Sequence, residues 1–451
     1  MNFKLRNIVA ATFAGTFLMG FGASAMADST FDLVQALVSK GVLTEEEALP
    51  LLKGREADIT AADKKVAKKA KIGISDAIDN ATVYGDIRAR YEMRKGSDSA
   101  LVGNNEQERN RARYKITFGV KTAADDFYTD LAFAMGGQGR SDNATFGNAK
   151  TNGGNDKETL FVKRAMIGWK ATDWLTVEAG RVKNPLFTQA MVWDGDLTFE
   201  GLVEKMNFAF TPDTSMFVTG VQSQYSGDSR DYNYKADQET NEMFATQVGV
   251  EHKFNDNIKG KAAVTYTAFS NSNKDLSTAK LSTIEVPMEL GFKTEGTLAY
   301  KAFGDYAFNM DASDRCKALV GAATCNKFGD EDDAWLVGGE IKSVQDPKGK
   351  KSTQGDWKAK IWYQSVGAFA LDPNAVDSDF MDSAVNMDGV VFKGEYNVRD
   401  NVFFNFAAGY GDIKNSNYNT FSKLYATKTG DIGAAKLDNY SLYQFDMTYK
   451  F

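Results

Sequence analysis

The sequence predicts an all-β fold, a transmembrane antiparallel β-barrel of about sixteen strands that follows a short N-terminal helical segment. Three observations lead to this prediction. The final residues, 439–451, alternate between large apolar and polar side chains and end on an aromatic residue. The chain has 40 Gly, 31 Phe and 18 Tyr but only 6 Pro, a mixture suited to strands. After residue 22, no apolar run approaches the roughly 18 residues that a membrane-spanning helix needs.

The terminal segment has the two-residue period of a strand with one apolar face. In an outer-membrane barrel such a strand closes against the first strand and leaves no sheet edge in the lipid. An edge strand of a soluble sheet is the alternative for this segment taken alone. The strand that ends at Phe451 is also the expected contact with the barrel-assembly machinery. Its apolar positions are Tyr443, Phe445, Met447, Tyr449 and Phe451.

The average composition of the chain does not distinguish a barrel of this kind from a soluble protein. The 451 residues are 43% hydrophobic and 25% charged, with a mean hydropathy of -0.38, which are values typical of a soluble protein. Only one side of each transmembrane strand contacts lipid, so the average conceals the pattern. The formal charge of -7 argues against nucleic acid as a partner.

Residues 1–27 have the features of a cleaved secretory signal peptide. Lys4 and Arg6 precede an apolar core at residues 8–21, and Ala-Met-Ala at 25–27 fits the small-x-small cleavage rule. A membrane anchor is the alternative. Export through the inner membrane is expected, with Asp28 as the first mature residue.

Residues 28–80 are predicted to form a periplasmic helical or tether segment ahead of a barrel domain at residues 81–451. An apolar stripe begins at Phe31, Gly41 interrupts it, and Thr44 starts a capping box, so residues 29–53 are the only convincingly helical region. A lysine-rich polar stretch follows. A trimerising or cell-wall-contacting role is the alternative to a solvated tether.

The period changes to two residues from Ala81 onward. In the first strand Val83, Ile87 and Tyr91 share one face, while Arg88 and Arg90 share the other. The second strand, which begins near residue 108, alternates in the same way. A basic side chain facing lipid at mid-bilayer would cost about 2 to 4 kcal/mol. We therefore expect these arginines to face the barrel interior.

The connections predict the strand count. Short turns on one side and long loops on the other are the outer-membrane pattern, and seven turns with eight loops join about sixteen strands. The expected turns lie at residues 122–126, 172–173, 211–215, 255–257, 293–296, 345–356 and 399–401. The expected loops lie near residues 95–108, 138–158, 183–198, 226–241, 270–283, 309–332, 368–387 and 412–438.

A barrel of this width encloses water, so its function depends on what narrows and charges the lumen. The third loop, 183–198, is the candidate for the narrowing because it is richer in apolar residues than the other loops. If it folds inward, it leaves an acidic set at the constriction. An ordinary rim loop is the alternative. The acidic residues are Asp194, Asp196 and Glu200.

A basic ladder is expected to line the pore opposite this acidic loop. Guanidinium groups stay charged at any working pH, and facing carboxylates would set up a transverse field that orients dipolar solutes. Salt bridges that only rigidify the wall are the alternative. The ladder comprises Arg88, Arg90, Arg109, Arg111, Arg113 and Lys115, with Arg164 and Arg181 from later strands.

No enzymatic chemistry is predicted. The chain has a single histidine, His252, which shares its parity with apolar residues near a turn, and it carries no nucleophile-elbow, zinc-binding or phosphate-loop motif. We therefore expect no cofactor and no metal site. Cys316 and Cys325, both in the sixth loop, are expected to form a loop-closing disulfide in an oxidising compartment, and free thiols are the alternative.

The chain resembles the putative porins of Gram-negative bacteria, which are general diffusion channels of the outer membrane. The resemblance rests on V-Y-G-D-I-R-A-R-Y-E at 83–92, R-N-R-A-R-Y-K-I-T-F-G-V at 109–120, K-R-A-M-I-G-W-K at 163–170, V-E-A-G-R-V-K-N-P at 177–185, the helical stretch 37–52 and the terminal Phe451. It implies a sixteen-strand barrel in the outer-membrane lipid, a homotrimer, and passive diffusion of ions and small hydrophilic solutes. One departure is that no long cell-wall-binding module precedes the barrel.

The expected function is therefore that of an outer-membrane porin, constricted by the third loop facing the arginines. A substrate-selective channel for anions or carboxylates is one alternative, favoured by the ladder and opposed by the acidic loop. A mainly structural envelope protein is the other.

Overall fold

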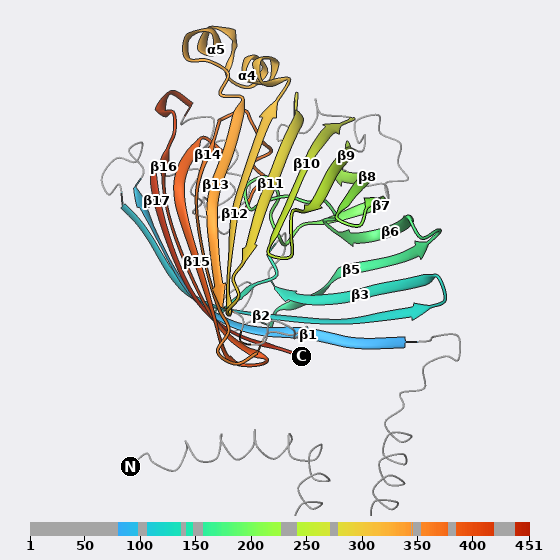
Figure 1. The fold of residues 1–451 in the computed structure, drawn as a ribbon. Helices are drawn as coiled ribbons and strands as arrows, with labels where there is room; N and C mark the ends of the chain where they lie inside the picture. The colour runs from blue at the N-terminus through green and yellow to red at the C-terminus, as the bar shows by residue number, and fades with distance from the viewer. Residues whose placement is uncertain are drawn as a thin grey trace, which may run out of the picture. The chain divides into compact units, whose positions relative to one another are not determined.

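The protein, represented by a computed structural model, is described at residues 80–97, 106–136, 141–147, 157–226, 241–270, 278–343, 345, 353–377, 385–418 and 438–451. The predicted signal peptide and almost all of the predicted tether lie outside the described residues. The described residues belong to one compact unit, residues 77–451. This unit is a closed antiparallel β-barrel (Figure 1).

Sixteen long strands form the barrel wall, which confirms the predicted fold class. One further strand of two residues, β4, extends the wall beside β2 beyond the end of β3. The strands are β1 (Asn80–Ser97), β2 (Glu106–Ala124), β3 (Phe127–Gly136), β4 (Ala144–Thr145), β5 (Thr159–Lys170), β6 (Leu175–Lys183), β7 (Thr198–Thr211), β8 (Thr214–Ser226), β9 (Asn241–Lys253), β10 (Ile258–Phe269), β11 (Ser282–Lys293), β12 (Leu298–Asn309), β13 (Asp333–Ser343), β14 (Trp357–Val366), β15 (Met387–Arg399), β16 (Val402–Ile413) and β17 (Asn439–Lys450).

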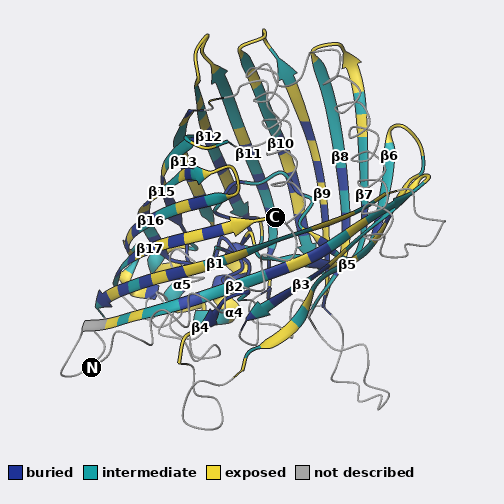
Figure 2. Ribbon diagram, turned by 90° about the horizontal axis from the view of Figure 1, so that it is seen from below, coloured by how far each residue is buried: buried dark blue, intermediate teal, exposed yellow. Residues whose placement is uncertain are grey.

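Buried and exposed residues alternate along the strands (Figure 2). The exposed positions carry apolar residues and many of the buried ones carry polar residues, which is the reverse of a soluble sheet. On β1, Ile87 is 49% exposed and Tyr91 is 47% exposed, whereas Arg90 is only 6% exposed. On β17, Met447 is 51% exposed, whereas Gln444 is 2% exposed. Large apolar residues thus face outward, where lipid replaces water, and polar residues face the lumen. None of the helices in the described ranges is both long and apolar enough to cross a bilayer.

The barrel closes between its first and last long strands. β1 pairs with β17 along twelve positions, from Asp86 opposite Lys450 to Ser97 opposite Asn439. At the end of the seam, the backbone N–H of Gly85 donates to the carbonyl of Phe451 (3.0 Å), and the N–H of Phe451 donates back (3.1 Å). The terminal strand therefore has partners on both edges, as predicted from its alternation.

Two short helices in the sixth loop correct the prediction that residues 29–53 are the only helical region. They are α4 (Ala312–Val320) and α5 (Ala322–Phe328), and α4 is rich in good helix formers. Gly321 and Gly329, both with positive φ, end the two helices. A disulfide joins Cys316 to Cys325, with 5.9 Å between the Cα atoms.

Gly85 provides a test of the closing seam. A Cβ atom on Gly85 would lie 2.6 Å from the Phe451 ring and closer still to the Thr117 carbonyl oxygen. We expect Gly85→Leu to destabilise the seam by about 1 to 3 kcal/mol, the usual cost of overpacking, and to lower the folded fraction on heat-modifiability gels. Ala89→Leu is the matched control, because Ala89 is exposed on the same outward face. Equal folding of both variants would contradict the assigned seam.

Candidate pore constriction and charged wall

The third loop, residues 184–197, lies against the inner face of β9 and β10. The backbone N–H of Phe187 donates to the side chain of Gln247 (2.8 Å), which donates back to the Phe187 carbonyl (2.8 Å) and to Thr265 (2.7 Å). Gln247 and Thr265 are fully buried. These contacts seat the loop on inward-facing residues of the wall.

Two carboxylates hold the next part of the loop. The Thr188 hydroxyl donates to Glu285 on β11, and the N–H of Gln189 donates to Asp305 on β12 (3.2 Å). The loop's apolar residues complete the packing, because Met191 is 1% exposed and Trp193 is 6% exposed. A loop that extended from the rim into water would expose these apolar side chains. Their burial against the inner wall is the physical reason for the inward docking.

A second loop segment, residues 367–377, also packs among buried residues, although the sequence predicted only an ordinary long loop near residues 368–387. The N–H of Asp194 donates to the carbonyl of Ala375 (2.7 Å), so the two loops contact each other. Asn309 on β12 donates to the carbonyl of Phe369 (2.9 Å). The signal was present in the apolar run G-A-F-A-L at 367–371, which matches the third loop in character.

The basic residues of β1 and β2 lie on the inner face of the wall, as the parity argument predicts. The strand register brings like charges together, an arrangement that is unfavourable without nearby anions. Arg94 has the same parity but was not among the predicted residues, although its alternation with Met93 could have identified it. The facing pairs are Arg88 with Lys115, Arg90 with Arg113, and Arg94 with Arg109.

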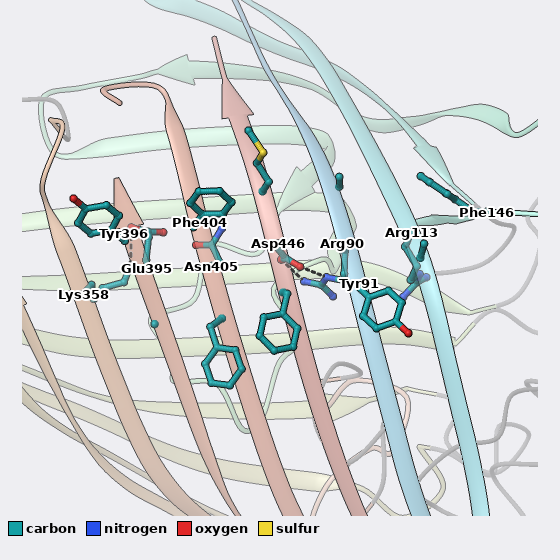
Figure 3. A pocket seen from close by; sticks show the side chains of 16 residues that line it. Arg90, Tyr91, Arg113, Phe146, Lys358, Glu395, Tyr396, Phe404, Asn405 and Asp446 are labelled. Atoms are coloured by element: carbon teal, nitrogen blue, oxygen red, sulfur yellow. Dashed lines mark hydrogen bonds and ion pairs between the residues drawn. The ribbon is translucent and has the colours of Figure 1, made fainter. Parts of the chain in front are cut away.

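Two strand carboxylates compensate part of this charge. Glu92, which is 0% exposed, contacts Arg94 (2.8 Å), Arg111 (2.7 Å) and Arg113 (3.6 Å). Asp446 on β17 accepts two hydrogen bonds from Arg90 (2.8 and 2.9 Å) and lies 3.6 Å from Arg88, as the Arg90 pair in Figure 3 shows. The alternation gives both carboxylates the parity of the polar face, but their pairing with these arginines was not predicted from the sequence.

A further network continues from β2 to β5. Asp142, which precedes β4, contacts Lys163 and lies 3.9 Å from Lys115. Arg164 pairs with Asp130 on β3 (2.9 Å). A register shift between β3 and β5, at Ala132/Phe133, interrupts the alternation, so that Lys163 and its neighbour Arg164 both contact inward-facing residues.

The predicted acidic residues separate into three environments. Asp194 is buried in the loop and accepts the backbone N–H of Asp196 (2.9 Å). Asp196 lies 3.8 Å from Lys163. Glu200 lies on β7 rather than in the loop, and it pairs with Arg181 across the β6–β7 register.

Arg181 and Glu200 occupy the face opposite to the one predicted. Arg181 shares its parity with Val177 and Ala179, while the buried Val182 and Phe199 beside the pair face inward. The pair is exposed on the outer surface. The prediction that Arg181 lines the pore and that Glu200 lies in the constriction is therefore wrong, because it did not apply the alternation to β6 and β7.

The outer surface has an apolar depression across the closing seam. This cavity of about 720 Å³ is lined chiefly by outward residues, among them Tyr91, Phe146, Tyr396 and Phe404 (Figure 3). It lies on the other face of the wall from the charged groups of the lumen. Within the described ranges, no group of three or more His, Cys, Asp or Glu residues is arranged to hold a metal ion.

A closed barrel of sixteen long strands, with apolar residues outside and charged residues around its lumen, belongs to one class of protein, the porin-type channels of the bacterial outer membrane. Residues 83–303 match the family described as a putative porin. This match confirms the resemblance to putative porins that the strand motifs of this part of the chain indicate. No curated protein sequence matches the chain.

Several solved structures are similar to the chain. OmpF of Salmonella typhi, in complex with daunomycin, has 13% identity and a TM-score of 0.47 over 84% of this chain and 99% of its own. The channel DcaP of Acinetobacter baumannii has 11% identity and a TM-score of 0.43 over 82% and 97%. OprB of Pseudomonas putida has 11% identity and a TM-score of 0.44 over 82% and 94%.

Proposed function

We propose that the protein is a non-enzymatic channel through which ions and small hydrophilic solutes diffuse, narrowed where the third loop faces the basic wall of β1 and β2. The main support is the docking of residues 184–197 on β9 to β12, because Gln247, Glu285 and Asp305 all hold the loop within the barrel. Sixteen strands are too many for wall side chains alone to fill the interior. The remaining space is a water-filled path.

Three further proposals accompany the proposed channel function. The chain is exported after cleavage of residues 1–27, its last strand is recognised by the barrel-assembly machinery, and three copies associate in the outer-membrane lipid. Domain boundaries at residues 28–80 and 81–451 belong to the same proposal. A structural envelope protein without a conducting path is the competing function.

Single-channel recording in a planar bilayer tests the proposal. Discrete open steps from purified protein with correct heat-modifiable folding are the expected result. Folded protein that inserts into the bilayer and yields no steps would support the structural envelope function instead.

A further inference from the structure

A second basic cluster lies on the inner face of the wall, on strands that the predicted ladder did not include. Lys360 on β14 faces Lys393 on β15 directly across the register. Lys301 on β12 and Lys358 on β14 share the inward face with them, because the alternate residues Tyr300, Ile361 and Phe392 are the exposed apolar ones.

The four lysines differ in their partners. Lys301 pairs with Glu289 (3.0 Å), Lys358 with Glu395 (3.5 Å), and Lys393 with Asp377 (3.8 Å). For Lys360, no carboxylate of the described residues lies within ion-pair distance, although Glu340 on β13 faces it directly across the register. Its ammonium group instead lies 4.2 Å from the ring centroid of Phe303 and 5.1 Å from that of Trp362.

The two rings fix the position of this charge. Trp362 is 2% exposed and Phe303 is 4% exposed, so both are held by the wall. The ammonium group of Lys393 lies over the same Trp362 ring, at 5.4 Å. Two ammonium groups are therefore held side by side on one aromatic platform. Like charges on directly opposite residues destabilise a sheet. Asp377 beside Lys393 and Glu340 opposite Lys360 offset part of this repulsion.

The lysine cluster and the arginine cluster lie on one continuous stretch of wall. From Lys393 the register runs through Ala407 on β16 and Gln444 on β17 to Glu92 on β1. Three strand spacings of about 4.8 Å separate Lys393 from Glu92, so the two clusters lie about 14 Å apart. The third loop docks next to the lysine cluster, because Gln189 binds Asp305 on β12, two positions along the strand from Phe303. An anion in the lumen would meet both clusters from the same water-filled space.

We propose that Lys360 and Lys393 form an anion-binding station inside the pore, which takes small solutes that carry a carboxylate or phosphate group. The proposal rests on the proposed channel function and names the solute class of that channel. The ammonium groups supply donors to the oxyanion, and the arginines of β1 and β2 form the neighbouring station along the wall.

Calorimetric titration of the detergent-solubilised full-length protein with citrate, and separately with inorganic phosphate, tests the station. Lys360→Met keeps the aliphatic stem over the two rings and removes the charge, and Lys393→Gln removes the second charge. Each change is expected to weaken binding of the oxyanion about fivefold, as loss of one solvated charge contact of about 1 kcal/mol predicts. Lys360→Arg should retain binding.

Arg181→Gln is the matched control, because it removes a cation from the outer surface and should leave binding unchanged. The station would be overturned if the Lys360→Met/Lys393→Gln double variant bound citrate as tightly as the wild type does and also bound phosphate as tightly as the wild type does. A loss for one probe only would assign the station to that oxyanion. Absence of conductance would contradict the channel function separately, since the titration needs no open pore.

Discussion

The Arg88→Gln/Arg111→Gln variant is expected to shift the reversal potential in a salt gradient toward cation preference. Each removed charge acts on a permeant ion at roughly 8 Å through water, which is worth about 0.5 kcal/mol. Two charges therefore change the permeability to each ion about fivefold, in opposite directions for cation and anion, so the cation-to-anion permeability ratio changes about thirtyfold. Recording at low ionic strength keeps this effect from being screened.

Substitution of Arg88 and Arg111 by Gln is expected to leave the fold intact. Asp446 retains its two hydrogen bonds from Arg90 after Arg88 is removed. Glu92 retains its contacts with Arg94 and Arg113 after Arg111 is removed. No carboxylate is therefore left buried without a partner. An unpaired buried carboxylate would cost several kcal/mol of stability.

Arg181→Gln again separates a lumen effect from a general effect of charge. Its guanidinium group lies on the outer face, paired with Glu200, so its removal should not move the reversal potential. If Arg181→Gln shifts the potential as much as the double variant does, the assignment of the inner and outer faces is wrong.

Replacement of residues 186–193 by a short Gly-Ser linker is expected to raise the single-channel conductance several-fold. Ionic current is limited by the narrowest cross-section of a pore, and this segment is the one that Gln247, Glu285 and Asp305 hold against the wall. Heat-modifiable migration and the β signal in circular dichroism should remain, because the sixteen strands pair without it.

Smaller changes give a graded test of the same loop. Thr188→Ala removes the hydrogen bond from the hydroxyl group to Glu285, and Gln247→Ala removes both hydrogen bonds with the backbone of Phe187. These variants should show noisier open states, since each lost buried hydrogen bond weakens docking by about 1 to 3 kcal/mol. Unchanged conductance in the linker variant would mean that another segment, such as residues 367–377, sets the narrowest section.

The strand pattern, the turns and the long loops were predictable because they are local. Alternation with a period of two depends only on adjacent residues, and lipid outside the barrel makes the apolar parity unmistakable. The inward direction of Arg88, Arg90 and Arg113 follows from the same local rule. The sequence also contained the information that Arg181 faces outward, since Val177 and Ala179 have its parity.

Tertiary structure alone decided which groups meet in the lumen. Asp446 contacts Arg90 although 356 positions separate them in the chain, because the closing register of β1 with β17 brings them together. The shift between β3 and β5 brings Lys163 to Asp142 and Asp196, and no local alternation predicts it. Pairing across a barrel is a property of the whole closed sheet. The sequence by itself therefore determined which face each strand turns to lipid, and only closure of the sheet determined which charges compensate one another inside.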